Sequence, residues 1–361
     1  MDYQMNASVS DVQTEDPVLV KRKVRGSYGK ACTAMLIQLA VILIVSGVAG
    51  AVTSSILSAN IMRENAGLDR AELMKKIMEA SQEMTTNQLY VMGVNAIAYL
   101  AANLGAFFLM LGALKAFKVS DVFSKPRKVS VLGLGLFGIL GVQGFSGLFQ
   151  CLIEWITGMT GVSEQMQTNM SFGDSTAANA VIFIYMVIIA PVTEEMLCRG
   201  FVLNALAPVD RRFALVASSL IFGLMHGNLN QIFNGFLLGL VLGYIALKTG
   251  SVLPSICAHM ICNFNAVMCG SISEKLFGEN ADTAVMVWFA FLFVAGIASL
   301  IVFVRKNGRI DNSSDKVVPY EIAVPEGGKG EFTWKALLTR PTFWIFTVIY
   351  MAMAISSITA A

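Results

Sequence analysis

Nine apolar stretches follow one another along this chain of 361 residues, and most of them are long enough to cross a membrane as helices. A transmembrane helix needs about 20 consecutive, mainly apolar residues. Lipid offers no hydrogen-bond partners to the backbone, so such stretches must satisfy their own peptide groups by forming helices. The sequence therefore predicts an all-α, polytopic membrane bundle with eight to nine transmembrane helices. The stretches are 31–57, 89–114, 129–156, 177–206, 213–226, 231–247, 252–268, 284–304 and 341–361.

The composition agrees with a protein whose solvent is largely lipid. Hydrophobic residues make up 55% of the chain and charged residues only 14%, against roughly 25% charged residues in soluble domains. The net charge of +2 gives no indication of nucleic-acid binding. The six cysteines lie in or beside apolar stretches and form no CxxC pair, so we expect buried free thiols rather than disulfides or structural zinc.

The distribution of basic residues predicts the orientation of the bundle, because Lys and Arg accumulate on the cytoplasmic side. Basic residues flank the first stretch and recur at every second connection along the chain. We therefore expect a cytoplasmic N-terminus and a multi-pass protein of the cell membrane. The first apolar stretch exceeds the 7–15 residues of a signal-peptide core, which argues against a secretory signal. The basic residues before the first stretch are Lys21, Arg22, Lys23, Arg25 and Lys30.

The segments between the apolar stretches predict how the chain is organised. Residues 62–87 have the pattern of an amphipathic helix at the outer membrane surface. The predicted parts are a cytoplasmic tail (1–30), an eight-helix transmembrane domain (31–304), a cytoplasmic linker (305–340) and a ninth helix (341–361).

Charged side chains are concentrated in one apolar stretch, where Glu194, Glu195 and Arg199 occur within six residues. Each charge at the centre of a membrane helix costs at least ~2.5–3.5 kcal/mol, so retained charges usually have a function. Glu195 and Arg199 are four residues apart and can pair on one helix face. Glu194 points about 100° away and has no local partner. Glu194 is therefore the candidate general base or acid.

The chain contains two histidines, and both follow in the next group of apolar stretches. His226 ends the segment Phe222-Gly-Leu-Met-His226, and His259 lies four residues before Asn263. His259 and Asn263 share a helix face and can therefore address one atom. Histidine titrates nearest neutrality, which suits proton transfer.

Each of these features also has a structural explanation when taken alone. Glu195 and Arg199 could be a buried pair that sets the rotation of the helix, His226 an interfacial residue, and His259 with Asn263 an interhelical hydrogen bond. Cys198 has no dedicated base and is interpreted as packing. Their occurrence together within about seventy residues favours a catalytic site. A stripe of small residues, Gly235, Gly239 and Gly243, is expected to pack the site-bearing helices closely.

The ordered motifs EExxxR, FxxxH and HxxxN resemble those of the CAAX prenyl protease and bacteriocin-processing (CPBP, or Abi) family of intramembrane peptidases. The resemblance covers approximately residues 180–270 and implies that they form the catalytic core of the transmembrane domain. It implies that Glu194 is the general base, that His226 helps to hold the attacking water, and that His259 and Asn263 stabilise the oxyanion. Glu195 with Arg199 would orient the helix and shape the field around Glu194.

The sequence is compatible with a zinc-dependent mechanism and with a metal-free one. Glu194, His226 and His259 could hold zinc and leave one position for water. The chain lacks an HExxH motif, and a metal-free mechanism uses the same residues, so we expect water activation without an obligatory metal.

The predicted function is hydrolysis of peptide bonds in a membrane-associated peptide or protein. Two alternatives remain: a non-proteolytic regulator or bacteriocin-immunity protein of the same family, and an ion-coupled transporter that uses the buried carboxylates and imidazoles. Many transporters have a repeat relating two halves, and the sequence shows none.

Overall fold

The computed structural model describes residues 16–127, 132–160, 172, 175–324 and 329–359, and the regular secondary structure in these residues is helical, without strands. This confirms the predicted all-α class. The long helices are α1 (Pro17–Glu64), α2 (Arg70–Thr86), α3 (Gln88–Leu114), α5 (Leu132–Thr160), α9 (Arg211–Leu224), α10 (Leu229–Thr249), α11 (Leu253–Phe277), α12 (Ala281–Asn307) and α14 (Pro341–Thr359). The short helices are α4 (Val119–Val122), α6 (Thr176–Phe183), α7 (Ala190–Glu195), α8 (Leu203–Leu206) and α13 (Trp334–Leu338).

All nine predicted stretches contain helix, although not all the helices are equally able to cross a membrane. Among the described helices, six are long and apolar enough, and a seventh is added if the bent pair Lys329–Leu338 and Pro341–Ser356 counts as one span. α9 has 14 residues, or about 21 Å of helix, whereas the hydrocarbon core is about 30 Å thick. The polytopic bundle is thus confirmed, and the number of eight to nine spans stays a prediction.

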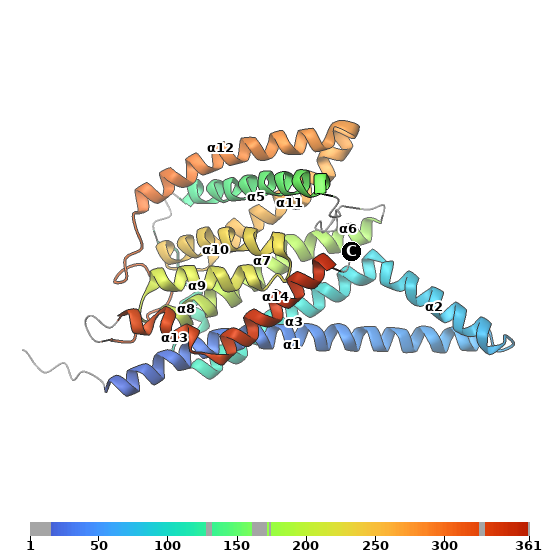
Figure 1. Cartoon of the computed structure of the whole chain (residues 1–361), viewed down its shortest axis with the longest axis horizontal. Helices are drawn as coiled ribbons and strands as arrows, with labels where there is room; N and C mark the ends of the chain where they lie inside the picture. Colours follow the sequence, from blue (N-terminus) through green and yellow to red (C-terminus); the bar gives the residue numbers. More distant parts are fainter. Residues whose placement is uncertain (1–15, 128–131, 161–171, 173–174, 325–328, 360–361) are drawn as a thin grey trace, which may run out of the picture.

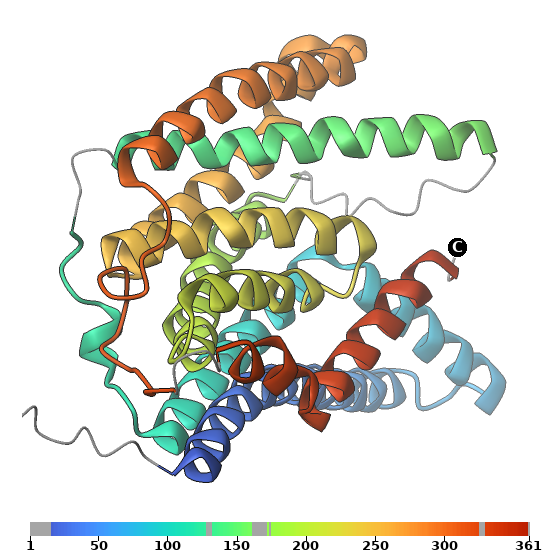
Figure 2. The ribbon, with the colours of Figure 1, turned by 60° about the vertical axis from the view of Figure 1, so that its left-hand side comes forward.

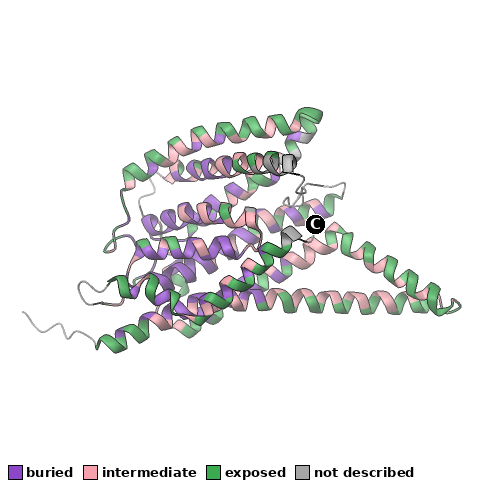
Figure 3. Cartoon of the chain, in the orientation of Figure 1, coloured by how far each residue is buried: buried purple, intermediate pink, exposed green. Residues whose placement is uncertain are grey.

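The bundle is arranged in layers (Figures 1 and 2). α5 and α12 lie side by side at one edge, α1, α3 and α14 lie at the opposite edge, and α9, α10 and α11 lie between them. Figure 3 shows that buried residues concentrate in this middle layer. α5 and α12 run antiparallel and in close contact, because Gly141 faces the backbone of Gly296 and Ile297.

The helix with the predicted charged residues has an unusual geometry. It is continuous from α6 to α8, but π-helical turns at Ile184–Ile189 and Met196–Val202 lie on either side of α7. Such wide turns are rare in helices and frequently occur at functional sites. Here they border Glu194 and Glu195, at the C-terminal end of α7.

The two ends of the predicted transmembrane domain differ in detail from the expected boundaries. α1 begins at Pro17, capped by the Asp16 side chain, so the boundary at residue 30 falls within a helix. The amphipathic segment forms α2, which projects away from the bundle together with the second half of α1 (Figure 1). The part of the predicted tail before residue 16 lies outside the described residues, as do residues 129–131 at the start of the third stretch.

The predicted linker is a folded segment that packs on the ends of several helices. Lys248 Nζ of α10 lies 2.6 Å from Asp315 Oδ2, and both side chains are buried. Arg211 Nη2 of α9 lies 2.7 Å from Glu321 Oε1. These ion pairs attach residues 308–324 to the middle layer instead of leaving them as a free connection.

Candidate active site

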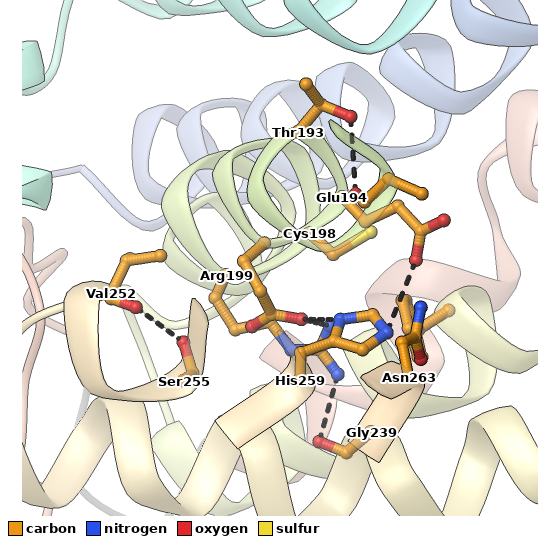
Figure 4. A network of polar contacts seen from close by, with 12 residues as sticks. Thr193, Glu194, Cys198, Arg199, Gly239, Val252, Ser255, His259 and Asn263 are labelled. Atoms are coloured by element: carbon orange, nitrogen blue, oxygen red, sulfur yellow. Dashed lines mark hydrogen bonds and ion pairs between the residues drawn. The ribbon is translucent and has the colours of Figure 1, made fainter. Parts of the chain in front are cut away.

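The predicted site residues come from three neighbouring elements of the bundle. Glu194, Glu195 and Arg199 lie on α7 and the π-helical turn that follows it, His259 and Asn263 lie on α11, and His226 follows the C-terminal end of α9. Figure 4 shows Glu194 and His259 facing each other, with Asn263 beside them. Glu194 and His259 are 5% and 3% exposed, so this polar group is enclosed by the helices.

Glu195 holds two partners through one oxygen. Its Oε1 lies 2.5 Å from Arg199 Nη1 and 3.1 Å from His259 Nδ1. Arg199 also donates from Nη2 to the Gly239 carbonyl of α10, at 3.3 Å. The predicted pair of Glu195 and Arg199 is therefore present, and it joins the site helix to both α10 and α11.

Glu194 approaches the opposite side of the same imidazole. Its Oε2 lies 3.9 Å from His259 Nε2, which is beyond hydrogen-bonding distance. His259 thus lies between two adjacent glutamates that play different roles. Glu195 is engaged by a guanidinium, whereas Glu194 has no cationic partner from its own helix.

Phe222 connects the two histidines with Arg199. The Arg199 Cζ atom lies 4.1 Å from the centre of the Phe222 ring, within the range of a cation–π contact. The rings of His226 and His259 contact the same phenyl group nearly edge-on, with centroid distances of 5.2 Å and 5.8 Å. His226 Nδ1 also lies 2.8 Å from the Phe222 carbonyl oxygen. His226 therefore joins the group by way of Phe222.

Asn263 ties α11 to the π-helical turn before α7. Its Nδ2 donates to the Met186 carbonyl at 2.8 Å. An asparagine amide has two N–H donors, so this contact leaves one of them for another acceptor.

Comparisons with known proteins found a matching family model and a similar protein. A family model described as "Type II CAAX prenyl endopeptidase Rce1-like" matches residues 176–265. This match supports assignment of the chain to the CPBP family. A protein of Bacillus subtilis (strain 168), named "Putative membrane peptidase YdiL", is 22% identical over 242 residues, which cover 66% of this chain and 97% of that protein. No solved structure matches the chain. Both similarities support an intramembrane protease.

The matched CPBP segment includes every predicted site residue, but the structure adds a contribution from α3, outside that segment. Asn103 Nδ2 of α3 donates to Thr193 Oγ1 at 2.9 Å. The ring of Tyr99, one turn earlier on α3, contacts the Tyr185 ring nearly edge-on, with a centroid distance of 5.9 Å. Neither Asn103 nor Tyr99 is among the site residues predicted from the sequence. The signal available in the sequence was a pair of polar side chains four residues apart in an apolar stretch.

Glu194, His226 and His259, the residues that could hold zinc, do not form a metal-binding group. Where the structure describes the chain, no three His, Cys, Asp or Glu side chains are placed to hold a metal ion. Glu194 and His259 face each other, but His226 reaches them through the Phe222 ring. The arrangement of these side chains does not fit a zinc ion.

The cysteines are free, as expected, but not all of them are buried. Cys32, Cys198 and Cys262 are buried, whereas Cys257 is exposed on α11. The prediction of a buried thiol is therefore wrong for Cys257, because its side chain lies on an outward-facing side of that helix. Cys198 packs in the interior, with its sulfur 3.7 Å from that of Met225.

Proposed function

We propose that this CPBP protein is an intramembrane endopeptidase that hydrolyses peptide bonds in a membrane-associated peptide or protein. The observation that supports this most directly is the position of His259 between Glu194 and Glu195. One carboxylate is charge-compensated by Arg199. The other faces the imidazole across 3.9 Å, a separation that one water can bridge with hydrogen bonds to both groups.

In the proposed first step, Glu194 acts as the general base. It removes a proton from the water as the water oxygen bonds to the scissile carbonyl carbon, and the carbonyl oxygen becomes an oxyanion. His226 helps to hold the water. In its doubly protonated form, His259 donates from Nδ1 to Glu195 and from Nε2 to the oxyanion, and the Asn263 amide donates a second hydrogen bond to the oxyanion. Donors of this kind typically contribute about 2.7–4 kcal/mol each to transition-state stabilisation.

The second step completes the hydrolysis. The tetrahedral intermediate re-forms its carbonyl, and the carbon–nitrogen bond breaks. The proton held by Glu194 passes to the leaving amine, which restores the carboxylate. Throughout both steps one negative charge moves from Glu194 to the oxyanion and back. Arg199 and Glu195 keep the electrostatic field around Glu194 constant, because neither residue takes part in proton transfer.

The test compares the termini of membrane peptides, by mass spectrometry, from cells that carry the wild type or Glu194→Gln at matched expression. Glu279→Gln is the control, because Glu279 is exposed and lies away from the site. We expect new termini with the wild type and the control, and none with Glu194→Gln. Indistinguishable termini, with biological activity retained by Glu194→Gln, would overturn proteolysis and favour a non-proteolytic regulator or immunity protein.

A further inference from the structure

The imidazole of His226 packs against the main chain of α10 at Gly235. A Cβ atom at Gly235 would lie 3.3 Å from His226 Nδ1 and 3.4 Å from His226 Cε1. Gly235 is buried, so little space remains for either group to move aside in a close-packed interior. The ring therefore occupies a space that exists because residue 235 has no side chain.

The other two glycines of the stripe make room for residues outside the site. A Cβ atom at Gly239 would lie 2.9 Å from Ser219 Cβ, and one at Gly243 would lie 2.6 Å from Leu215 Cδ1. Both neighbours are packing residues of α9. Gly235 is thus the member of the stripe whose missing side chain accommodates a site residue.

The main chain of α9 determines which nitrogen of this ring carries the proton. His226 Nδ1 lies 2.8 Å from the Phe222 carbonyl oxygen. A carbonyl oxygen can only accept a hydrogen bond, so in the neutral imidazole the proton lies on Nδ1. The lone pair is then on Nε2, which can accept a hydrogen bond but cannot donate one.

The two histidines of the site are held in different ways. His259 lies between two glutamate side chains, which orient its ring. His226 has no carboxylate partner in the part of the chain that the structure describes, and it is partly exposed. Its orientation depends on the Phe222 carbonyl and on the surface left free at Gly235. A methyl group at residue 235 would push the ring off that surface and away from the carbonyl.

We propose that Gly235 is a positioning residue for His226. It seats the imidazole against α10 in the tautomer that is protonated at Nδ1, so that Nε2 stays available as a hydrogen-bond acceptor. In the proposed mechanism, this acceptor holds the attacking water by one of its protons. The kinetic role rests on the proposed peptidase function, whereas the seat and the tautomer do not.

The first test determines the tautomer without requiring activity. The chain contains two histidines, so full-length protein labelled with ¹⁵N-histidine in detergent micelles gives two sets of ring-nitrogen NMR signals, which His226→Gln assigns. At a pH at which the ring is neutral, we expect wild-type His226 to be protonated at Nδ1. Gly235→Ala should shift the proton toward Nε2. A wild-type ring protonated at Nε2 would overturn the proposal, even if the chain is a peptidase.

The second test measures the seat by chemical modification. Diethyl pyrocarbonate acylates unprotonated ring nitrogens, and peptide mass spectrometry gives the rate at His226 relative to His259. We expect this ratio to rise several-fold in Gly235→Ala, because the displaced ring is more accessible. Gly243→Ala adds the same methyl group to the same stripe but meets Leu215, so its ratio should equal that of the wild type. A parallel rise at both histidines would indicate general loosening of the bundle and overturn the proposal.

The third test uses a peptide substrate identified from the membrane-peptide comparison. Gly235→Ala should lower kcat by about 10-fold or more, because a misplaced ring no longer holds the water in position. KM should stay unchanged, and Gly243→Ala should keep both values. A raised KM with unchanged kcat would overturn the positioning role. If no substrate emerges, the first two tests still decide the seat and the tautomer, so failure of the proposed function is distinguishable from failure of this inference.

Discussion

His259 Nδ1 lies 3.1 Å from Glu195 Oε1, the same oxygen that binds Arg199. This relationship fixes which ring nitrogen of His259 faces Glu194, because the Glu195 oxygen accepts the Nδ1 proton. The two consecutive glutamates are thereby separated in function. Glu195 orients His259 and neutralises the charge of Arg199, whereas Glu194 is available for the reaction.

Removing the charge of Glu195 should destabilise the fold. Glu195→Gln leaves the Arg199 guanidinium buried without its anion, and breaking a buried pair in this way costs about 3–5 kcal/mol. We expect a clearly lower Tm in detergent. Glu79→Gln interrupts the exposed Lys75–Glu79 pair, and exposed pairs contribute about 0–1 kcal/mol. Equal decreases in Tm for the two variants would contradict a stabilising role of the buried pair.

Asn263 should affect turnover more than substrate binding. Asn263→Ala removes a proposed oxyanion donor, so we expect kcat to fall by about 10²–10³-fold with little change in KM. Asn265→Ala on the same helix is the control, because Asn265 binds Gln143 and Trp288 instead. Unchanged kcat in Asn263→Ala would exclude the oxyanion role.

Close packing at Gly239 should make the smallest added side chain costly. A Cβ atom at this position would lie 2.9 Å from Ser219 Cβ of α9, so one helix would have to shift. Overpacking typically costs about 1–3 kcal/mol. We therefore expect a lower Tm for Gly239→Ala. We also expect lower activity, since the Gly239 carbonyl binds Arg199.

Gly93→Ala provides the matched comparison. A Cβ atom at Gly93 of α3 would meet nothing within 4 Å, and replacing glycine by alanine within a helix is favourable by about 0.5–1 kcal/mol. Its Tm should stay the same or rise. Similar losses in the two variants would show that Gly239 has no special packing role.

The buried pair of Lys248 and Asp315 should control access to the segment after α12. Asp315→Ala removes the acceptor of Lys248 and of the Asp311 backbone N–H. We expect faster tryptic cleavage at Arg309 and Lys316, measured by limited proteolysis of the intact protein. Glu331→Ala disrupts only an exposed ion pair, so this variant should be cleaved by trypsin at the wild-type rate. Unchanged cleavage in Asp315→Ala would contradict the anchoring role.

Stability should also depend on pH through Glu321, outside the membrane-spanning segments. Hydrogen bonds from Lys316 and Arg211 lower the pKa of Glu321 below its ordinary 4.5. A carboxylate with a lowered folded-state pKa stabilises the fold above its unfolded pKa, and the stabilisation is lost as pH falls through the folded pKa. Below about pH 4.5, wild-type Tm should therefore fall more steeply than that of Glu321→Gln. Parallel curves would contradict this contribution.

The sequence was most informative where residues share one helix. Glu195 and Arg199 are four residues apart and form the expected pair, and the stripe of Gly235, Gly239 and Gly243 faces α9 as a close-packing surface. Helical periodicity decides such relationships before any packing occurs. The length and polarity of the apolar stretches likewise determined the all-α membrane class, because lipid leaves the backbone few alternatives.

Only the tertiary structure decided which helices meet, and at what depth. It placed His259 between the two glutamates, linked His226 to the group through Phe222, and brought Asn103 of α3 to Thr193. It also folded the predicted linker onto α9 and α10 through ion pairs. Spacing along a helix states which side chains share a face, but contacts between helices depend on rotation, tilt and depth. Those are set by the packing of the whole bundle.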